Sequence, residues 1–247
     1  MALADPPMLI SAAPTVRIAG QSLPLLSNAI QSLRVTEQLG GLSSLELSVF
    51  DVLSFADGSA GWGATANSPL QLGAAIKIYT GETGAPREIF DGVITGIEGD
   101  YREGQPPLFT ILAEDRLWTA RRKRRSRIFE NKSPADIVRA IAGDHGLTPE
   151  VRDGLDGPTS TWAQMNESDL GFMRRILARF DCDVQCVENK LQAGPRARDA
   201  RTAVTLTQGA ELNRARITAD LADQATSVRL RSVDSVRPSG LCAFGIT

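Results

Sequence analysis

Apolar and polar residues alternate through the first half of the chain with the period of two that is typical of half-buried β-strands. The alternation predicts strands at 16–18, 29–37, 44–50, 75–79, 88–98 and 108–114. Gly40 and Gly41 separate two of these segments, which predicts a hairpin with one face on a core. Strands at this short, turn-bounded spacing favour a small barrel or a sandwich.

Two departures from the alternation predict local features of this β-region. Gly92 and Gly96 lie inside one strand and predict a bulge or a tight bend. Residues 51–68 are rich in Gly, Ala, Ser and Asp and predict a long loop, in which Trp62 is the one large anchor.

The hydrophobic period changes to that of a helix after residue 132. Ser133 predicts an N-cap, Pro134 a first helical position and Asp136 the partner in a capping box. Gly146 predicts the end of this helix. Its apolar stripe consists of Ile137, Val138, Ile141 and Ala142.

A second amphipathic helix is predicted to begin near Ser168 and Asp169. One face is apolar and the opposite face carries Arg174, Arg175 and Arg179. The apolar face consists of Leu170, Met173, Ile176, Leu177 and Phe180. Residues 183–187 and 190–193 predict a small hairpin, so this part of the chain is expected to be a compact α+β module.

Strands are predicted to resume after residue 200, at 203–207, 215–220 and 225–233. Residues 237–247 show no period. Two or three strands cannot form an independent domain, so this segment is expected to be the incomplete start of another sheet. The fold class is therefore α+β, mainly β.

Composition limits the function classes. The net charge of −2 over 247 residues gives the whole chain no electrostatic reason to bind nucleic acid. Cys182, Cys186 and Cys242 are an odd number and predict a reducing cytoplasm, not a disulfide framework. The N-terminal residues lack a basic region and a long apolar core, so no signal peptide is expected. No apolar run reaches the ~20 residues of a membrane span.

The basic run Arg121–Arg127 contains six cations in seven residues. One interpretation is a phosphate-binding patch, whose affinity would fall steeply with salt. The other is a strand or turn whose charges face solvent or acidic partners. Because no aromatic residues are interleaved and no nucleic-acid motif surrounds the run, the second interpretation is preferred.

No catalytic, cofactor or metal site is predicted. His145 is the only histidine and lies where a helix end favours a cation. Cys182 and Cys186 are expected to be small core residues. Nothing in the sequence selects a catalytic pair among the carboxylates Asp91, Glu114, Asp115, Glu167 and Asp169, and the last two fit the positive N-terminal end of the second helix.

Several segments, in order and spacing, resemble the hub proteins of contractile tails: the phage late-control D protein and the hub portion of the VgrG spike protein of type VI secretion. Each segment alone is weak, but together they cover residues 15–233. The segments are 89–97, 112–118 (LAEDRLW), 122–129 (RKRRSRIF), 136–138, 145–147, 164–175 (QMNESDLGFMRR) and 225–229.

The resemblance implies a first hub β-barrel at 1–120, an α+β module with two helices at 121–200 and part of a second β-barrel at 201–247. It implies a structural baseplate component, not an enzyme, without a cofactor. Three copies would form an adaptor between the hexameric tail tube and the spike. The implied partners are the tail tube protein, the spike protein and other baseplate proteins, with no small-molecule substrate.

Under this hypothesis the protein is assembled in the bacterial cytoplasm and becomes part of a phage tail or injection particle. The expected subunit contacts involve strands 29–50 and 88–98. The main alternative is a nucleic-acid-binding module that uses residues 121–127. A cell-wall hydrolase is a weaker alternative, because no segment is left for one.

Overall fold

The computed structural model describes residues 14–38, 42–50, 52–54, 60–62, 69–80, 86–152, 154–157, 159–196, 205–209, 212, 214–217, 228–233 and 241–246. The chain separates into two compact units. Met8–Arg201 form one unit, and Met1–Pro7 with Thr202–Thr247 form the other. The division into three domains at 120 and 200 stays a prediction.

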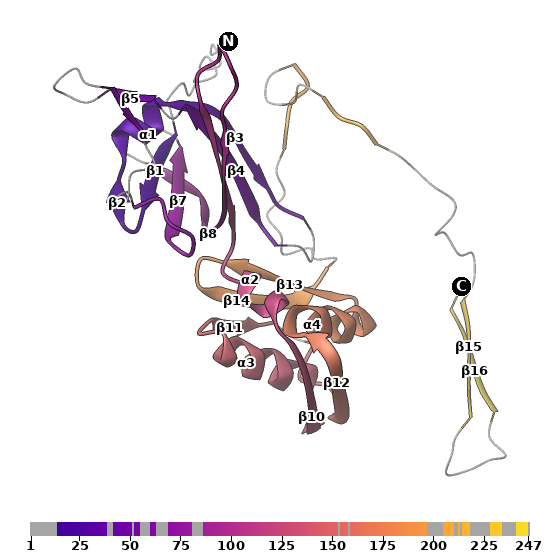
Figure 1. The fold of residues 1–247 in the computed structure, drawn as a ribbon. Coiled ribbons are helices and arrows are strands. Elements are labelled where there is room, and N and C mark those ends of the chain that lie inside the picture. Colours follow the sequence, from indigo (N-terminus) through magenta and orange to yellow (C-terminus); the bar gives the residue numbers. More distant parts are fainter. Residues whose placement is uncertain are drawn as a thin grey trace. The chain divides into compact units, whose positions relative to one another are not determined.

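A seven-stranded sheet is the first feature of the larger unit (Figure 1). Its spatial order is β2-β1-β7-β8-β9-β4-β3, and all its neighbours are antiparallel. The strands are β1 (Thr15–Ile18), β2 (Gln21–Ser22), β3 (Ile30–Thr36), β4 (Ser44–Phe50), β7 (Ala75–Thr80), β8 (Arg87–Asp100) and β9 (Leu108–Glu114). The predicted β3–β4 hairpin is confirmed.

Strand β8 joins the two halves of this sheet. Its first half pairs with β7 and its second half with β9, and the register with β9 shifts between Ile94 and Gly96. Gly92 allows a close approach, because a Cβ there would lie 2.3 Å from the Glu114 carbonyl oxygen. The predicted irregularity at these glycines is confirmed.

The sheet is not closed. Among the described residues, β3 pairs only with β4 and β2 only with β1. The α+β, mainly β class is correct, whereas a closed barrel is not confirmed. A short helix, α1 (Pro24–Asn28), follows β2 and was not predicted.

The sheet buries one face on an apolar core, as the period of two predicts. Every core member except Leu26 in α1 comes from a strand. The buried members are Val16, Ile18, Leu26, Leu45, Leu47, Val49, Ile76, Ile78, Phe90, Ile94, Phe109, Ile111 and Ala113.

The predicted long loop at 51–68 contains a short ribbon. Strands β5 (Val52–Ser54) and β6 (Ala60–Trp62) pair antiparallel. The prediction was therefore wrong over these six positions, and its other positions lie outside the described residues.

The α+β module follows the sheet in the same unit (Figure 1). Its strands form an antiparallel β10–β12 ribbon and a three-stranded sheet in the order β11-β14-β13. Its elements are α2 (Trp118–Arg122), β10 (Arg124–Lys132), α3 (Pro134–Asp144), β11 (Thr148–Val151), β12 (Ser160–Ser168), α4 (Asp169–Leu177), the 3₁₀ turn η1 (Ala178–Phe180), β13 (Cys182–Val187) and β14 (Lys190–Pro195).

Both predicted helices and the predicted hairpin β13–β14 are present. Ser133 caps α3, and its hydroxyl accepts a hydrogen bond from the Asp136 amide while the Asp136 carboxylate accepts one from the Ser133 amide. Gly146 follows with a φ of 65°, which suits glycine at a helix end. Ser168 caps α4 through the Gly171 amide. The strands β11 and β12 and the helix α2 were not predicted.

The module has its own apolar core between the two helices and the strands. Phe172 of α4 is fully buried and stacks on Phe129 of β10 with ring centroids 5.6 Å apart. The buried aliphatic members from the helices are Ile137, Val138, Ile141, Leu170, Met173, Ile176 and Leu177. Both helical stripes predicted from the period therefore face this core.

The smaller unit contains strands β15 (Val228–Val233) and β16 (Leu241–Ile246), which pair antiparallel. The predicted strand 225–233 is confirmed where it is described, but β16 lies in a segment expected to have no regular structure. The strands predicted at 203–207 and 215–220 are absent at 205–207 and 215–217, and their remaining positions lie outside the described residues. Membership of a second barrel stays a prediction.

No helix in the described part of the chain is both long enough and apolar enough to cross a membrane.

Candidate assembly surface

Half of the cations in the basic run are engaged with carboxylates of the same chain. Arg121, at the end of α2, pairs with Glu114 through Nε and Nη2. Arg127 Nη1 lies 2.6 Å from Asp144 Oδ2, and its Nη2 lies 2.9 Å from Asp169 Oδ1. Arg125 approaches the same two carboxylates at 3.1 and 3.5 Å. The sequence analysis expected these charges to face solvent or acidic partners. For Arg121, Arg125 and Arg127 the acidic partners belong to the same subunit.

The other three cations, Arg122, Lys123 and Arg124, are exposed. Arg122 lies over the Trp118 ring at 4.8 Å. Arg124 donates a hydrogen bond to the Asn166 carbonyl. None of the three has a carboxylate partner among the described residues. We refer to Arg122–Lys123–Arg124 as the basic triplet.

His145 connects the two helices of the module to α2. It follows the last residue of α3, where the sequence places it, and its side chain is 9 % exposed. Its Nε2 lies 2.9 Å from Asp169 Oδ2 and its Nδ1 lies 2.9 Å from the Thr119 hydroxyl. The partners that the sequence did not reveal are thus Thr119 and Asp169, which are 26 and 24 residues away.

This Thr–His–Asp arrangement is structural in character. The Asp169 carboxylate also accepts hydrogen bonds from Gln164 and Arg127, so its charge is balanced by guanidinium groups. Burial acts to raise the pKa of Asp169, but hydrogen bonds from Gln164 and His145 and the charges of Arg127 and Arg125 outweigh it and hold the pKa below 3.8. The network fixes β10, β12, α3 and α4 to one another.

The two described cysteines are core residues, as predicted. Cys182 and Cys186 are buried thiols whose sulfurs donate to the carbonyl groups of Phe180 and Glu188. Burial raises the pKa of Cys186 to about 12, with a further contribution from the charge of Asp115. The thiolate form that reacts or binds metal is therefore suppressed. Cys242 lies in β16, and its side chain is outside the described part of the structure.

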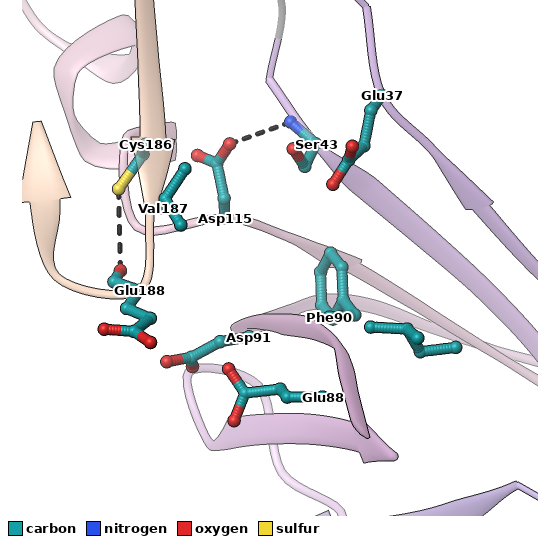
Figure 2. Close-up of a pocket in the computed structure, with 10 residues that line it drawn as sticks. Glu37, Ser43, Glu88, Phe90, Asp91, Asp115, Cys186, Val187 and Glu188 are labelled. Carbon is teal, nitrogen blue, oxygen red and sulfur yellow. Dashed lines mark hydrogen bonds between the residues drawn. The ribbon is translucent and has the colours of Figure 1, made fainter. Parts of the chain in front are cut away.

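A groove opens between the sheet and the β13–β14 turn, with a cavity of about 200 Å³ (Figure 2). Five of its ten lining residues are acidic. They come from the end of β3, the start of β8, the end of β9 and the β13–β14 turn. We call this the acidic groove; its acidic members are Glu37, Glu88, Asp91, Asp115 and Glu188.

Two buried carboxylates form the floor of the acidic groove. Asp115 is 3 % exposed and accepts hydrogen bonds from the Ser43 and Leu117 amides at 2.8 and 2.9 Å. Burial raises its pKa to about 6 against the effect of these two amides, and the charges of Glu114 and Glu37 add to the rise. The surroundings of Asp115 therefore favour its protonated form more than water does.

The second floor residue, Asp91, has a side chain that is only 6 % exposed. Its Oδ2 lies 3.0 Å from Lys77 Nζ, and its Oδ1 lies 3.6 Å from Arg116 Nη2. No described group donates a hydrogen bond to Oδ1, although this atom is buried. The charge of Arg116, not a hydrogen bond, therefore compensates this oxygen.

The other candidate carboxylates have structural partners. Glu167 pairs with Arg175 at 3.0 Å, and Asp169 is the first residue of α4, as the helix-end argument predicts. No group of three or more His, Cys, Asp or Glu side chains that could hold a metal occurs within the described ranges. The sequence could not have shown that Asp91 and Asp115 line one groove, because sheet pairing brings them together.

Comparison with protein families identifies the class of this chain. The family model of the phage tail baseplate hub (GPD) matches residues 36–241, so the chain belongs to that family. The sequence-based resemblance to tail hub proteins is thus confirmed. No curated protein matches the chain.

Solved structures show the same fold at low sequence identity. The 43 kDa tail protein of prophage MuSo2 from Shewanella oneidensis is 14% identical with a TM-score of 0.69, and the match covers 95% of this chain and 68% of that one. A tail protein from Neisseria meningitidis is 10% identical with a TM-score of 0.62, covering 94% of this chain and 66% of that one.

A third similar structure comes from another kind of machine. An E. coli component of the type VI secretion system is 17% identical with a TM-score of 0.50, and the match covers 72% of this chain and 48% of that one. The present chain spans about two thirds of the two tail proteins and about half of this component.

Proposed function

We propose that this chain is a non-enzymatic hub subunit of a contractile phage tail or related injection system, and that it works as a homotrimeric adaptor between the hexameric tail tube and the spike. It would be assembled in the bacterial cytoplasm and become part of the tail or injection particle. Its partners would be the tail tube protein, the spike protein and other baseplate proteins.

The observation that carries this proposal is the family match over residues 36–241, to a family of tail baseplate hubs. The chemistry of the described residues is consistent with it. His145 and Asp169 serve a network that holds the module together, and the Cys186 thiol is kept protonated by burial. His145, Asp169 and Cys186, the side chains best suited to chemistry, thus have structural roles.

Nucleic-acid binding by residues 121–127 is a weaker alternative. Since Arg121, Arg125 and Arg127 are paired with carboxylates, only the basic triplet is available for phosphate contacts. Fewer phosphate contacts give a shallower salt dependence and a lower affinity. A binding assay over a range of salt concentrations measures this directly.

Oligomeric state and particle location test the proposal. The purified chain is expected to sediment as a trimer, and electron microscopy of intact tails should place it in a ring with threefold symmetry between tube and spike. Co-expression with the tube and spike proteins should give a complex that copurifies. A chain that stays monomeric with both partners and is absent from tail particles would contradict the proposal.

A further inference from the structure

The acidic groove and the basic triplet have opposite charges, and each keeps charged groups that form no ion pair in the described part of the chain. In the groove, Glu37 and Glu188 form no ion pair with any described residue and lie on opposite walls (Figure 2). Elsewhere on the subunit, the triplet has no carboxylate partner among the described residues. The chain as a whole carries a net charge of only −2, so local excesses of opposite sign nearly cancel over the full sequence.

The groove has the size and the negative charge of a receptor for a cationic side chain. Its cavity of about 200 Å³ is several times the ~30 Å³ share of one water molecule, so it has room for a long cationic side chain. Asp91 also lines the cavity, but its carboxylate is buried and pairs with Lys77 and Arg116, so Glu37 and Glu188 are the carboxylates left for a cation from outside. Guanidinium and ammonium groups donate to carboxylates with short, strong hydrogen bonds, whereas phosphate would be repelled.

The groove also lies beside an open sheet edge. Glu37 follows β3, which pairs only with β4 among the described residues. A second hollow of about 510 Å³ continues along this edge, lined by Val35, Thr80 and Arg87 and sharing Glu37, Glu88 and Ile89 with the acidic groove. An unpaired edge beside a continuous hollow is a place where another chain can be accommodated.

One carboxylate of the groove lies close to the basic triplet in the sequence. Asp115 is in the groove, and helix α2, which begins at Trp118, leads into the basic triplet. A subunit that carries both halves of a contact makes head-to-tail interfaces, and such interfaces close into a ring when the rotation permits.

We propose that the acidic groove of one subunit receives the basic triplet of the next copy in the hub ring. This inference rests on the homotrimer of the proposed function and assigns its contact. The occupant is a second copy of this chain, because the same sequence supplies both the unneutralised carboxylates and the unneutralised cations. The salt-dependent part of trimer stability would come from this pairing.

Charge reversal of each half tests the pairing in the full chain. We expect Glu37→Lys with Glu188→Lys, and separately Lys123→Glu with Arg124→Glu, each to raise the trimer dissociation constant by about 10- to 100-fold, since like charges then face each other. The variant that carries all four reversals restores opposite charges at every interface and should recover most of the affinity. Analytical ultracentrifugation over a range of protein concentrations measures the trimer dissociation constant of each of the three variants.

A matched control separates the pairing from the effect of net charge. Lys132 and Arg174 are exposed and lie outside both surfaces. Reversing both to Glu gives the same change in charge as the triplet variant, and the trimer should be unaffected. Circular dichroism confirms that each variant is folded; for one that unfolds, the neutral changes Glu37→Gln with Glu188→Gln or Lys123→Gln with Arg124→Gln replace it, with a smaller expected loss of affinity.

The outcomes distinguish the two proposals. If the wild type is a trimer and neither reversal weakens it, or if the fourfold variant does not recover, the contact is elsewhere and this inference is wrong while the hub assignment stands. If the triplet reversal abolishes nucleic-acid binding and leaves the trimer intact, the triplet serves the alternative function. A wild type that is monomeric in solution and missing from tail particles overturns the proposed function itself.

Discussion

Asp115 at the end of the sheet and Asp169 in the module are both almost fully buried, at 3 % and 1 % exposure, yet their pKa values shift in opposite directions. Burial raises the pKa of Asp115 to about 6, with a further contribution from the charges of Glu114 and Glu37, and two backbone amides oppose the rise. Asp169 is met by Gln164 and His145 and by two arginines, and its pKa falls.

Burial acts to raise the pKa of both carboxylates; the hydrogen bonds and arginine charges around Asp169 outweigh it, whereas the two amides at Asp115 do not. In the module, the buried Asp169 carboxylate pairs with Arg125 and Arg127 of the basic run and so holds neighbouring elements together. The edge of the sheet instead keeps an anion that its own surroundings only partly accommodate, next to a groove where further carboxylates gather. In the module, cations of the same subunit neutralise the buried carboxylate. The groove at the end of the sheet is instead suited to a cation from another molecule.

Removing the anion from the module should have the largest effect. We expect Asp169→Ala to lower the free energy of unfolding by about 3–5 kcal/mol, because Arg125, Arg127 and His145 lose a buried acceptor. Urea denaturation measures the loss. Asp156→Ala is the control, since the Asp156 side chain is 64% exposed and its pair with Arg139 is worth at most about 1 kcal/mol. Equal effects of the two substitutions would contradict the structural role of the network.

The raised pKa of Asp115 predicts a pH dependence of a definite sign. The folded state holds this proton more tightly than the unfolded state, so the contribution is complete below pH 3.8 and is lost as pH rises through about 6. The shift corresponds to about 2–3 kcal/mol. Relative to Asp115→Asn, the wild type should therefore lose stability across this window in urea titrations at several pH values.

Asp169 should behave in the opposite way. Its folded pKa is depressed, so the stability of the wild type relative to Asp169→Asn is present above pH 3.8 and is lost as pH falls through the folded value. Parallel slopes for the two Asn variants would show that the contrast between the two carboxylates is wrong.

Glycine-to-alanine substitution should lower the free energy of unfolding in the sheet and raise it in the module. At Gly92 in β8 the new methyl group would meet the Glu114 carbonyl at 2.3 Å and the Phe90 ring at 2.7 Å, so we expect a loss of about 1–3 kcal/mol. At Gly143 in α3 nothing lies within 4 Å, so Ala should stabilise by about 0.5–1 kcal/mol. Thermal unfolding of the two variants measures the difference, and a stable Gly92→Ala protein would argue against the close approach of β8 and β9.

The capping of α3 should give the smallest effect. Ser133→Ala removes the acceptor for the Asp136 amide and should cost about 1 kcal/mol. Ser133→Asp, which keeps an acceptor at this position, should restore most of the loss. If neither change alters the urea midpoint, packing alone fixes the start of this helix.

The sequence by itself determined those elements whose signal is local. The period of two predicts β3, β4 and β7–β9, and the Ser133–Asp136 box predicts α3, because side-chain direction and capping depend on a few neighbouring residues. The segments in hub-like order also sufficed to predict the family. Strands β11, β12 and β16 were missed, since their residues lack a clear alternation; the partners of β11 and β12 also lie far along the chain.

Only the tertiary structure decided what the charged residues do. Glu114, Asp144 and Asp169 neutralise half of the basic run, and Thr119 and Asp169 share His145, across separations that no local pattern encodes. The same holds for the acidic groove, where sheet pairing and the β13–β14 turn bring five carboxylates together. Hydrophobic period fixes which face of an element is buried, but the pairing of charges depends on which elements become neighbours, and long-range packing alone sets that.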